Sequence, residues 1–474
     1  MRPGESSGTD SAPLPHVVSW SSYPRRTAAL LAVVVALSIG VQVWTGLASA
    51  PAVVFLLLVV VVGAQIVLGL FDRPRGLDRV SRATSTRAQP DTVPRRPGDP
   101  DVVALVPCYN EDPAALRACL RGFLAQTRLP DGVVVVDDGS TTGGYETVEA
   151  WFRLAADELG VRATWLRQAN GGKRRAQVHG AEAEPHADVY VTVDSDSILD
   201  GRALENGLVA FDDPQVQSVA AVILTTNVAQ NLLTRVVDVF CVSLHLFERA
   251  AFSRLDSVMV NSGGCALYRA DVIRDNVETY LGETILGRPV HFSDDSMLTL
   301  FALRRGAAVQ QSNCVAFTLM PDRLGHHLRQ QLRWMRGSFI RSGWRLRHLP
   351  LHRAAYWLHL AKWLMYTTVT ATFFVVVLSG GLSTPLTAGS AALGAVALYS
   401  LTTLRYATIE RSDRTRAQTL RTLCLAPLAG IWSLTALRVL RWYAMATFAN
   451  VGWGTRASVE VRQPTAPDPT SLTG

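Results

Sequence analysis

Two long runs of residues near the N-terminus contain no charged side chain, and they constrain the fold more than any other feature. They are TAALLAVVVALSIGVQVWTGLAS at residues 27–49 and AVVFLLLVVVVGAQIVLGLF at residues 52–71. Each run is long enough to cross about 30 Å of hydrocarbon as an α-helix. A secretory signal peptide is the alternative for the first run, but its apolar part is too long and a second run follows at once. The sequence therefore predicts an integral membrane protein, with a transmembrane helix pair at 27–71.

The placement of arginine predicts the orientation of this helix pair. The link between the two runs carries no charge, whereas residues 72–101 contain seven arginines. The positive-inside rule places such a basic linker in the cytoplasm, although a merely solvated linker is compatible with the same topology. Much of the net charge of +7 is thus a topology signal, which favours anionic lipid headgroups over nucleic acid as partners.

The ends of the chain and its cysteines point to no separate chemistry. Residues 1–26 are predicted to be a disordered cytoplasmic N-terminus, and the Pro- and Thr-rich residues 457–474 a disordered tail. Six cysteines have no metal-ligand spacing, and none lies in a predicted outer loop, so we expect reduced, mostly structural thiols. A length of 474 residues suits two or three domains.

The middle of the chain, residues 102–320, alternates short apolar runs with amphipathic stretches. The apolar runs predict strands at 102–107, 133–136, 163–167 and 189–193, and the amphipathic stretches predict helices after Asp112, over 144–158 and from Lys173. This alternation indicates an α/β domain with a parallel sheet covered on both faces. Ligands of such sheets bind beyond the carboxyl ends of the strands. The predicted strands end in PCYNED, DDGS and DSDS, so we expect the site at that edge.

Two short motifs at this edge suit a nucleoside diphosphate. Asp194 and Asp196 are two residues apart at a strand end, where a period of two points both carboxylates to the same side. Mg²⁺ takes one or two carboxylates and fills its shell with water and phosphate oxygens. The run NGGKR at residues 170–174 is a glycine turn that opens a helix and offers positive charge and N–H groups to an anion. Each motif alone is weak, since Asp-x-Asp also occurs in solvated turns; together they predict a metal-dependent nucleotide site.

The stretch RQQLRWMRGSF at residues 329–339 is predicted to be an amphipathic helix. At about 100° per residue, Gln330, Arg333 and Trp334 lie on one side of it. The apolar side, which includes Met335 and Phe339, could lie in a bilayer surface and leave the polar side to face a ligand. Trp334 as an interfacial anchor is the alternative. Residues 321–350 are assigned to such interface helices.

The C-terminal part is predicted to return to the membrane. Residues 354–378 and 385–404 form a second pair of spans within a membrane region at 351–404, and the basic segment 405–421 is expected to lie at the cytoplasmic interface as a helix. The last segment, 422–456, carries Arg438 and Arg441, and an arginine at mid-bilayer costs about 2.5–3.5 kcal/mol. We therefore expect a bent or re-entrant hairpin instead of a full span.

These motifs resemble those of the inverting, processive membrane glycosyltransferases, that is, the hyaluronan synthases with chitin and cellulose synthases as cousins. The resemblance covers residues 102–345 and recurs near the C-terminus. It rests on PCYNEDP (107–113), DDGS (137–140), QANGGKRRAQ (168–177), DSDS (194–197), NSGGCALYR (261–269), SDD followed by MLT (293–299), QQLRW (330–334) and NVGWGTR (450–456). It implies a GT-A (Rossmann-like) domain that transfers sugars from UDP-sugars to a growing β-linked chain.

The resemblance also assigns roles to individual residues. It implies that Asp295 is the general base, with Gln330, Arg333 and Trp334 completing the catalytic group. The nucleotide contacts it implies are Tyr109, Glu111, Asp138, Lys173, Asp194, Arg333 and Trp453. The acceptor contacts it implies are Gly263, Cys265, Tyr268, Arg269 and Trp334. Asp194 and Asp196 would hold Mg²⁺ or Mn²⁺, and Asp294 would order the loop beside the base.

Some positions depart from the family pattern and leave the product open. Ser293 and Ser296 stand where hyaluronan synthases usually have Gly and Arg, and Ala169 where many relatives have Pro. Our first expectation is hyaluronan made from UDP-GlcNAc and UDP-GlcA by a multi-pass plasma-membrane protein with a cytoplasmic catalytic domain. A chitin-like GlcNAc polymer or oligomer, another β-glycan, a non-processive lipid-linked sugar transferase and an inactive scaffold are the alternatives.

Overall fold

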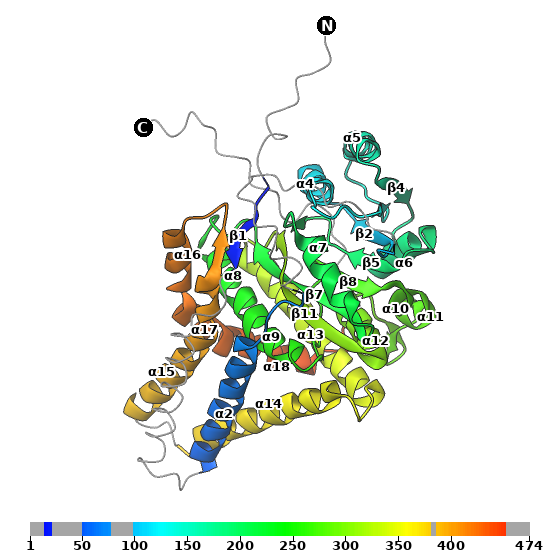
Figure 1. Cartoon of the computed structure of the whole chain (residues 1–474). Coiled ribbons are helices and arrows are strands. Elements are labelled where there is room, and N and C mark those ends of the chain that lie inside the picture. The colour runs from blue at the N-terminus through cyan, green and yellow to red at the C-terminus, as the bar shows by residue number, and fades with distance from the viewer. Residues whose placement is uncertain (1–13, 21–49, 77–97, 381–384, 452–474) are drawn as a thin grey trace, which may run out of the picture.

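A mixed eight-stranded sheet forms the centre of the molecule (Figure 1). The computed structural model describes residues 14–20, 50–76, 98–380 and 385–451. The strand order is β4-β3-β2-β5-β8-β7-β11-β6. The strands are β2 (Val102–Cys108), β3 (Gly132–Asp137), β4 (Arg162–Arg167), β5 (Val189–Thr192), β6 (Ile198–Leu199), β7 (Val216–Thr225), β8 (Ala266–Arg269) and β11 (Ala307–Thr318). The four strands predicted from the sequence are therefore confirmed.

The prediction of a parallel sheet is right for one half only. Strands β4, β3, β2 and β5 run parallel. Strand β8 runs antiparallel to both β5 and β7, while β11 is parallel to β7 and antiparallel to β6. In β8, Ala266 pairs with Thr192 at the carboxyl end of β5, and Arg269 pairs with Val189 at its amino end. The chain thus enters β8 from the edge that carries the polar loops and leads away from it.

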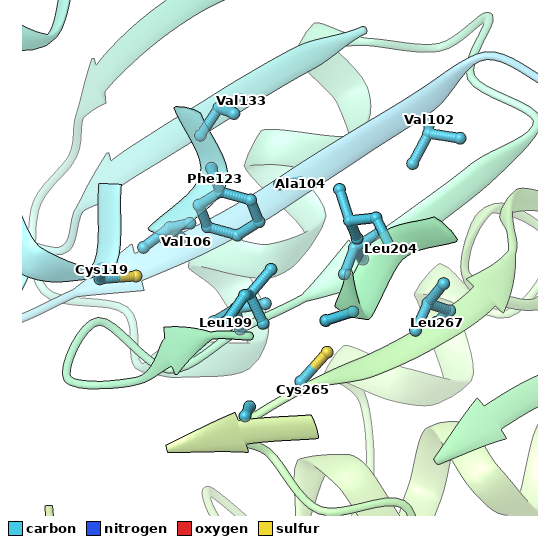
Figure 2. Close-up of a cluster of buried hydrophobic side chains, with 14 of the residues drawn as sticks. Val102, Ala104, Val106, Cys119, Phe123, Val133, Leu199, Leu204, Cys265 and Leu267 are labelled. Carbon is cyan, nitrogen blue, oxygen red and sulfur yellow. The ribbon is translucent and has the colours of Figure 1, made fainter. Parts of the chain in front are cut away.

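Alternate residues of the strands supply two cores, one on each face of the sheet. Val102, Ala104 and Val106 of β2 pack with Phe123 of α4 on one face (Figure 2). Val103 and Leu105 pack on the other face, with residues of α6 and α12. The helices around the sheet are α4 (Pro113–Leu124), α5 (Tyr145–Glu158), α6 (Lys173–Ala183), α7 (Ala203–Leu208), α8 (Leu232–Leu244), α9 (Ala250–Ser253), α10 (Ala270–Arg274), α11 (Val277–Leu281) and α12 (Asp294–Arg305). The period-two alternation is what a sheet covered on both faces requires.

Shorter elements connect these helices and strands. The 3-10 turn η1 (Val209–Asp212) follows α7, and the π-helical turn η2 (His245–Arg249) joins α8 to α9. The hairpin β9 (Thr284–Ile285) and β10 (Arg288–Pro289) precedes α12. Asp112 caps α4 by accepting a hydrogen bond from the Ala114 N–H group, as predicted from Asp112-Pro113.

Apolar helices gather on one side of the α/β domain (Figure 1). They are α2 (Ala50–Leu70), α14 (Ala354–Leu378), α15 (Pro385–Thr402) and α17 (Ala426–Leu434), and the amphipathic α18 (Ala436–Ala446) follows α17. In the described part of the chain, two helical stretches are long and apolar enough to cross a membrane, namely Ala354–Leu378 and Arg416–Ala446. The second comprises α16 (Arg416–Leu423), α17 and α18, and it is interrupted at residues 424–425 and at Thr435. The predicted span 27–49 lies outside the described residues.

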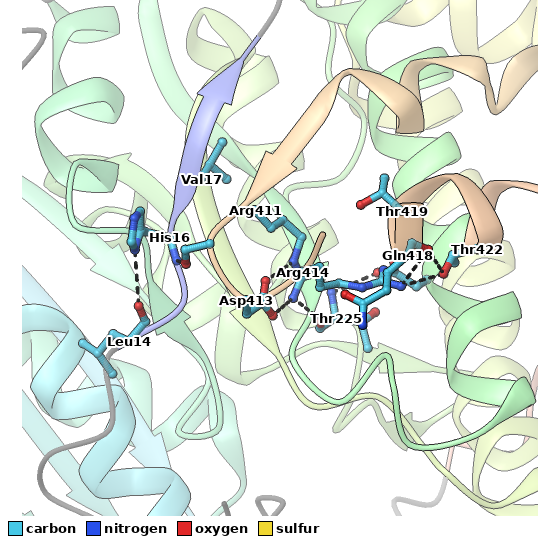
Figure 3. Close-up of polar contacts among 12 residues, drawn as sticks. Leu14, His16, Val17, Thr225, Arg411, Asp413, Arg414, Gln418, Thr419 and Thr422 are labelled. Atoms are coloured by element: carbon cyan, nitrogen blue, oxygen red, sulfur yellow. Dashed lines mark hydrogen bonds and ion pairs between the residues drawn. The ribbon is translucent and has the colours of Figure 1, made fainter. Parts of the chain in front are cut away.

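The N-terminal segment is partly ordered, which corrects the prediction of disorder over 1–26. Strand β1 (Val17–Trp20) pairs antiparallel with β12 (Ile409–Arg411), as Figure 3 shows. The Val17 N–H group donates to Asp200 Oδ2 at 2.7 Å, and the Ser412 N–H group donates to the His16 carbonyl at 2.8 Å. This pairing could not be predicted from the polar start of the chain, because the partner strand lies almost 400 residues away in the sequence. Residues 1–13 and 21–26 lie outside the described residues.

The prediction of one interfacial helix over the basic segment 405–421 is wrong. It consists of η3 (Leu404–Thr408), β12 and α16. The Arg405 guanidinium is buried and donates to the carbonyls of Gly69 and Leu246 at 3.0 and 2.7 Å. Arg411 is buried as well, where it pairs with Asp413 at 2.6 Å and donates to the Thr225 carbonyl (Figure 3). Arg411 therefore binds the segment to β7 of the α/β domain, and Arg405 binds it to α2 and η2.

Candidate active site

The loops after β2 and β5 meet at the carboxyl edge of the parallel strands. Glu111, in the loop after β2, is buried, and its Oε2 accepts a hydrogen bond from Ser195 Oγ at 3.0 Å. Ser195 lies between Asp194 and Asp196 in the loop after β5. Tyr109 is half-buried in the same β2 loop. The edge thus brings together the PCYNED loop and the Asp-x-Asp motif, as predicted.

Asp138, in the loop after β3, holds the glycine loop that precedes α6. Its Oδ1 accepts hydrogen bonds from Gln168 Nε2 at 2.7 Å and from the Gly171 N–H group at 2.8 Å, and its Oδ2 accepts from the Gly172 N–H group at 2.8 Å. Both carboxylate oxygens are therefore engaged in fixing the start of α6 and, with it, Lys173. A direct contact of Asp138 with the nucleotide stays a prediction.

Lys173 lies between two carboxylates from different parts of the chain. Its Nζ is 2.6 Å from Asp194 Oδ1 and 2.8 Å from Asp294 Oδ2. Burial alone lowers the pKa of Lys173, but the carboxylates of Asp194 and Asp294 raise it well above its usual value. Gly263 leaves room for this cluster, because a Cβ there would lie 2.9 Å from Asp194 Oδ2 and 3.0 Å from Lys173 Nζ. The acceptor role of Gly263 stays a prediction, and its backbone does border the cluster.

Asp194 and Asp196 offer an oxygen donor set that suits a divalent cation. Asp194 is partly exposed beside Lys173, and Asp196 Oδ1 accepts a hydrogen bond from Thr318 Oγ1 at 3.2 Å, at the end of β11. No group of three His, Cys, Asp or Glu side chains that could hold a metal occurs within the described ranges. Two carboxylates nevertheless fit Mg²⁺ or Mn²⁺ when the diphosphate and water complete the shell.

Asp294 and Asp295 begin α12 and have different partners. Asp294 is buried and pairs with Lys173, so its pKa is lowered even though burial by itself would raise it. The Asp295 carboxylate accepts a hydrogen bond from the Ser296 N–H group at 2.8 Å. Burial and the neighbouring Asp294 carboxylate raise the pKa of Asp295 to about 7. A carboxyl with a pKa near neutrality can both take up and release a proton at physiological pH, which suits a general base.

Helix α13 (Leu324–His348) passes directly over the start of α12. Gly337 makes the close approach, because a Cβ there would lie 2.7 Å from Ser293 Cβ. Trp334 lies one turn earlier on the same face and is 45% exposed. Gln330 lies a further turn back, and its Oε1 is buried. The predicted polar side of the helix is thus the side that approaches Ser293 at the start of α12. Arg333 lies beside it and is half-buried.

The predicted apolar side of α13 meets other helices. Phe339 packs against Trp363 of α14, with ring centroids 5.6 Å apart. The Arg441 guanidinium of α18 lies over the Phe339 ring at 5.2 Å and over Tyr366 at 4.8 Å. This part of the apolar side is therefore covered by protein, whereas we had expected it in the bilayer surface. The same contacts give Arg441 aromatic partners.

Three predicted acceptor residues lie in strand β8 or directly before it. Cys265 is fully buried in the core between the sheet and α4 (Figure 2). Tyr268 is fully buried in the core on the opposite face. Arg269, at the far end of β8, donates to the carbonyls of Val216 and Phe211. Because β8 runs away from the polar edge, the side chains of Cys265 and Tyr268 pack the two cores. Contact of these three residues with the acceptor stays a prediction. Trp453, the last predicted nucleotide contact, lies outside the described residues.

Glu283 and Arg341 belong to this neighbourhood, although neither lies in a motif selected from the sequence. The Glu283 carboxylate accepts hydrogen bonds from Arg174 and Arg341 at 2.7–2.9 Å, in the interior beside α12. The helical spacing from Trp334 to Arg341, seven residues or two turns, places both on one face. That spacing was the only available signal, and it could have identified Arg341 but not Glu283.

Comparisons with known proteins identify the family of this chain. Residues 103–277 match the family described as Glycosyl transferase family 2. A hyaluronan synthase of Streptococcus pyogenes is 31% identical over 368 residues, which cover 77% of this chain and 85% of that protein. An N-acetylglucosaminyltransferase of Azorhizobium caulinodans is 34% identical over 248 residues, covering 51% of this chain and 61% of that protein.

A solved structure was also found to be similar. It is a mannosyltransferase from Pyrobaculum calidifontis in complex with GDP-Man and Mn²⁺, 20% identical, covering 81% of this chain and 99% of that chain with a TM-score of 0.47. The predicted GT-A-like α/β domain is confirmed by the family match and by the sheet itself. On the identity and coverage of the streptococcal protein, this chain belongs to the hyaluronan synthase family of glycosyltransferases.

Proposed function

We propose that this protein is a processive synthase that builds hyaluronan from UDP-GlcNAc and UDP-GlcA and passes the nascent chain through its own membrane region. One observation carries the proposal beyond family membership. The cluster of Lys173, Asp194 and Asp294 lies beside Asp295 at the sheet edge, and α13 with Trp334 lies over it. A donor diphosphate and an acceptor sugar would therefore meet at Asp295.

The donor is held by charge in this proposal. Lys173 binds the diphosphate through its ammonium group, and the start of α6 adds N–H groups. Asp194 and Asp196 hold a divalent cation, Mg²⁺ or Mn²⁺, which neutralises charge on the diphosphate when it is bound. Tyr109 and Glu111 lie in the loop beside the nucleotide. Arg333 stabilises negative charge on the departing UDP, and Trp453 is proposed to contact the nucleotide.

Transfer itself needs one base. Asp295 takes the proton from the acceptor hydroxyl, and the hydroxyl oxygen forms a bond to the anomeric carbon from the face opposite UDP. The bond from that carbon to the phosphate oxygen breaks, and UDP leaves with the electron pair. An α-linked donor thus yields a β-linkage. Trp334 offers a flat apolar surface to the terminal sugar, and Gln330 offers an amide to its hydroxyls.

We further propose a multi-pass plasma-membrane protein with the α/β domain in the cytoplasm. The support is the uncharged run 27–49, the apolar helices α2, α14 and α15 on one side of the domain, and the seven arginines of 72–101. The bend at Thr435 between α17 and α18 supports a re-entrant final segment. Membrane lipids and the nascent polysaccharide are then the partners.

Donor use tests the proposal. Membranes that contain the protein are incubated with labelled UDP-GlcNAc, with and without UDP-GlcA, and the products are sized. We expect high-molecular-mass product only when both donors are present. Efficient polymer from UDP-GlcNAc alone would replace the hyaluronan proposal with a chitin-like one, and single-sugar products would indicate a non-processive transferase.

A further inference from the structure

A fully buried glutamate bridges two arginines between the donor cluster and α13. Glu283 precedes the β9–β10 hairpin, and its side chain and that of Arg341 are both 0% exposed. Arg341 donates through Nη1 to Glu283 Oε1 and through Nη2 to Oε2, both at 2.9 Å. Arg174 donates through Nη2 to the same Oε2 at 2.7 Å. One carboxylate thus accepts three charge-assisted hydrogen bonds from two elements of the fold.

The bridge connects the parts that the reaction has to align. Arg174 follows Lys173 in the first turn of α6, and it also donates to the Phe292 carbonyl at 2.7 Å, just before α12. Arg341 Nε donates to Ser296 Oγ at 3.3 Å, next to the base Asp295. The network therefore contacts the neighbours of the donor lysine and of the base, and it does so from the helix that carries Trp334.

Arg341 is well placed to fix the position of Trp334. The two residues are seven apart, which is about 10.5 Å along the axis and nearly the same rotation. Gly337 lies between them, in close approach to Ser293. A helix held at Arg341 and Gly337 cannot rotate or slide without moving Trp334 relative to Asp295. The fork of the guanidinium group sets this geometry more strictly than a single ammonium could.

Stability alone is a weak reason for such a network. Removing three charged groups from water carries a penalty that their mutual attraction often fails to exceed, and apolar side chains of similar volume can replace buried ion pairs. The network is therefore better explained by the geometry that it imposes. We propose that Glu283 is a positioning residue, which holds α13 and Trp334 in register with Asp295 and Lys173 during chain elongation. This inference rests on the proposed function.

Glu283→Gln is the principal test, made in the full-length protein in its membrane. The change keeps the shape but places an amide N–H₂ group against arginine donors. We expect sugar incorporation per bound donor to fall about 10²-fold, as for a misplacement of about 1 Å at the reacting groups. The KM for each UDP-sugar and the affinity for UDP should change less than about threefold. UDP release per incorporated sugar should rise, because water replaces the misplaced acceptor.

Glu149 offers a matched control on the surface. It also bridges two arginines, Arg153 at 3.0 Å and Arg167 at 3.2 Å, but these side chains are about half exposed. Exposed ion pairs contribute little, so Glu149→Gln should retain wild-type turnover, product size and UDP release per sugar.

Arg341→Lys guards against a variant that fails to fold. It leaves a positive charge beside Glu283, so no buried carboxylate is left unpaired, but it loses the fork and the contact with Ser296. We expect thermal stability and UDP affinity near those of the wild type, together with fewer sugars incorporated per UDP released. The inference would be overturned if Glu283→Gln and Arg341→Lys both incorporate as many sugars per UDP released as the wild type. A parallel loss of UDP affinity and turnover would also overturn it. If the wild type itself incorporates no sugar, the proposed function fails and not the positioning role alone.

Discussion

In the proposed function, the residues at the sheet edge form a donor half of the site, and the residues of α13 form an acceptor half. The two halves differ in how many hydrogen-bond and ion-pair partners their polar groups have. In the donor half, Lys173 already contacts Asp194 at 2.6 Å and Asp294 at 2.8 Å. In the acceptor half, on α13, Trp334 is 45% exposed, and the buried Gln330 Oε1 has no hydrogen-bond partner within the described residues. In the proposed function the donor half is therefore preorganised for a diphosphate, whereas the acceptor half keeps contact surface for a chain that must advance after each addition.

Replacement of the base should have the largest effect, because both halves depend on it. Asp295→Asn keeps the shape of the side chain and removes its basicity. Polymer formation should fall by about 10²–10⁴-fold, whereas metal-dependent UDP binding should persist, since Lys173, Asp194 and Asp196 are unchanged. Labelled sugar incorporation and UDP affinity, measured on the same preparation, check both parts.

Asp294→Asn is the matched control for this prediction. Asp294 pairs with Lys173 and not with the acceptor in our assignment, so its loss should be milder and should act partly on donor affinity. If Asp294→Asn abolishes transfer and Asp295→Asn does not, the two roles must be exchanged.

Loss of the donor lysine should have the next largest effect and should be confined to the donor half. Lys173→Gln removes a charge-assisted contact, for which we expect a loss of about 1.5–3 kcal/mol in the binding of UDP-sugar, or about 10- to 150-fold in affinity. Transfer from donor that is already bound should change much less. Isothermal titration with UDP, beside single-turnover transfer at saturating donor, separates these effects. Equal losses in both would contradict the division into two halves.

The donor half was largely predictable from the sequence, and the reason is local. Strand β2 and the loop PCYNED are contiguous, as are β5 and DSDS, and parallel strands bring their carboxyl ends to one edge. Asp194, Asp196 and Lys173 could therefore be placed from short motifs. The pairing of Lys173 with Asp294 could not be predicted, because the two residues are 121 positions apart in the sequence. Asp294 begins a helix, and the strand pattern does not predict where that helix lies.

The remaining errors share one physical cause, namely long-range packing. The antiparallel course of β8 places Arg269 beside the amino end of β5, and a local motif carries no information about strand direction. The pairing of β1 with β12 joins residues that lie almost 400 positions apart in the sequence. Glu283 is an ordinary charged residue in the sequence, and only the fold brings Arg174 and Arg341 to it.

Removal of the exposed indole should affect the acceptor half alone. Trp334→Ala should lose about 1–3 kcal/mol of stacking with the terminal sugar. Elongation and product length should therefore decrease while UDP affinity remains at the wild-type value. Trp357→Ala, at another exposed tryptophan, on α14, is a suitable control. Should UDP affinity fall while elongation per bound donor stays normal, Trp334 has a structural role instead.

The smallest expected effect lies at the contact between the two halves, and it tests whether α13 must approach α12 so closely. Gly337→Ala adds a methyl group that would lie 2.7 Å from Ser293 Cβ and 2.8 Å from Ser293 Oγ. Overpacking of this kind costs about 1–3 kcal/mol, partly offset by the higher helix propensity of alanine, about 1 kcal/mol. We expect a modest loss of thermal stability and a larger loss of elongation, because the helix moves away from Asp295.

Ser293 has a positive φ of 64°, which glycine tolerates, so Ser293→Gly removes both clashing atoms without backbone strain. The double variant should then recover elongation, with a coupling energy in thermal unfolding of about 0.5–3 kcal/mol. Strictly additive effects of the two changes would mean that the contact between Gly337 and Ser293 does not set the distance between donor and acceptor halves.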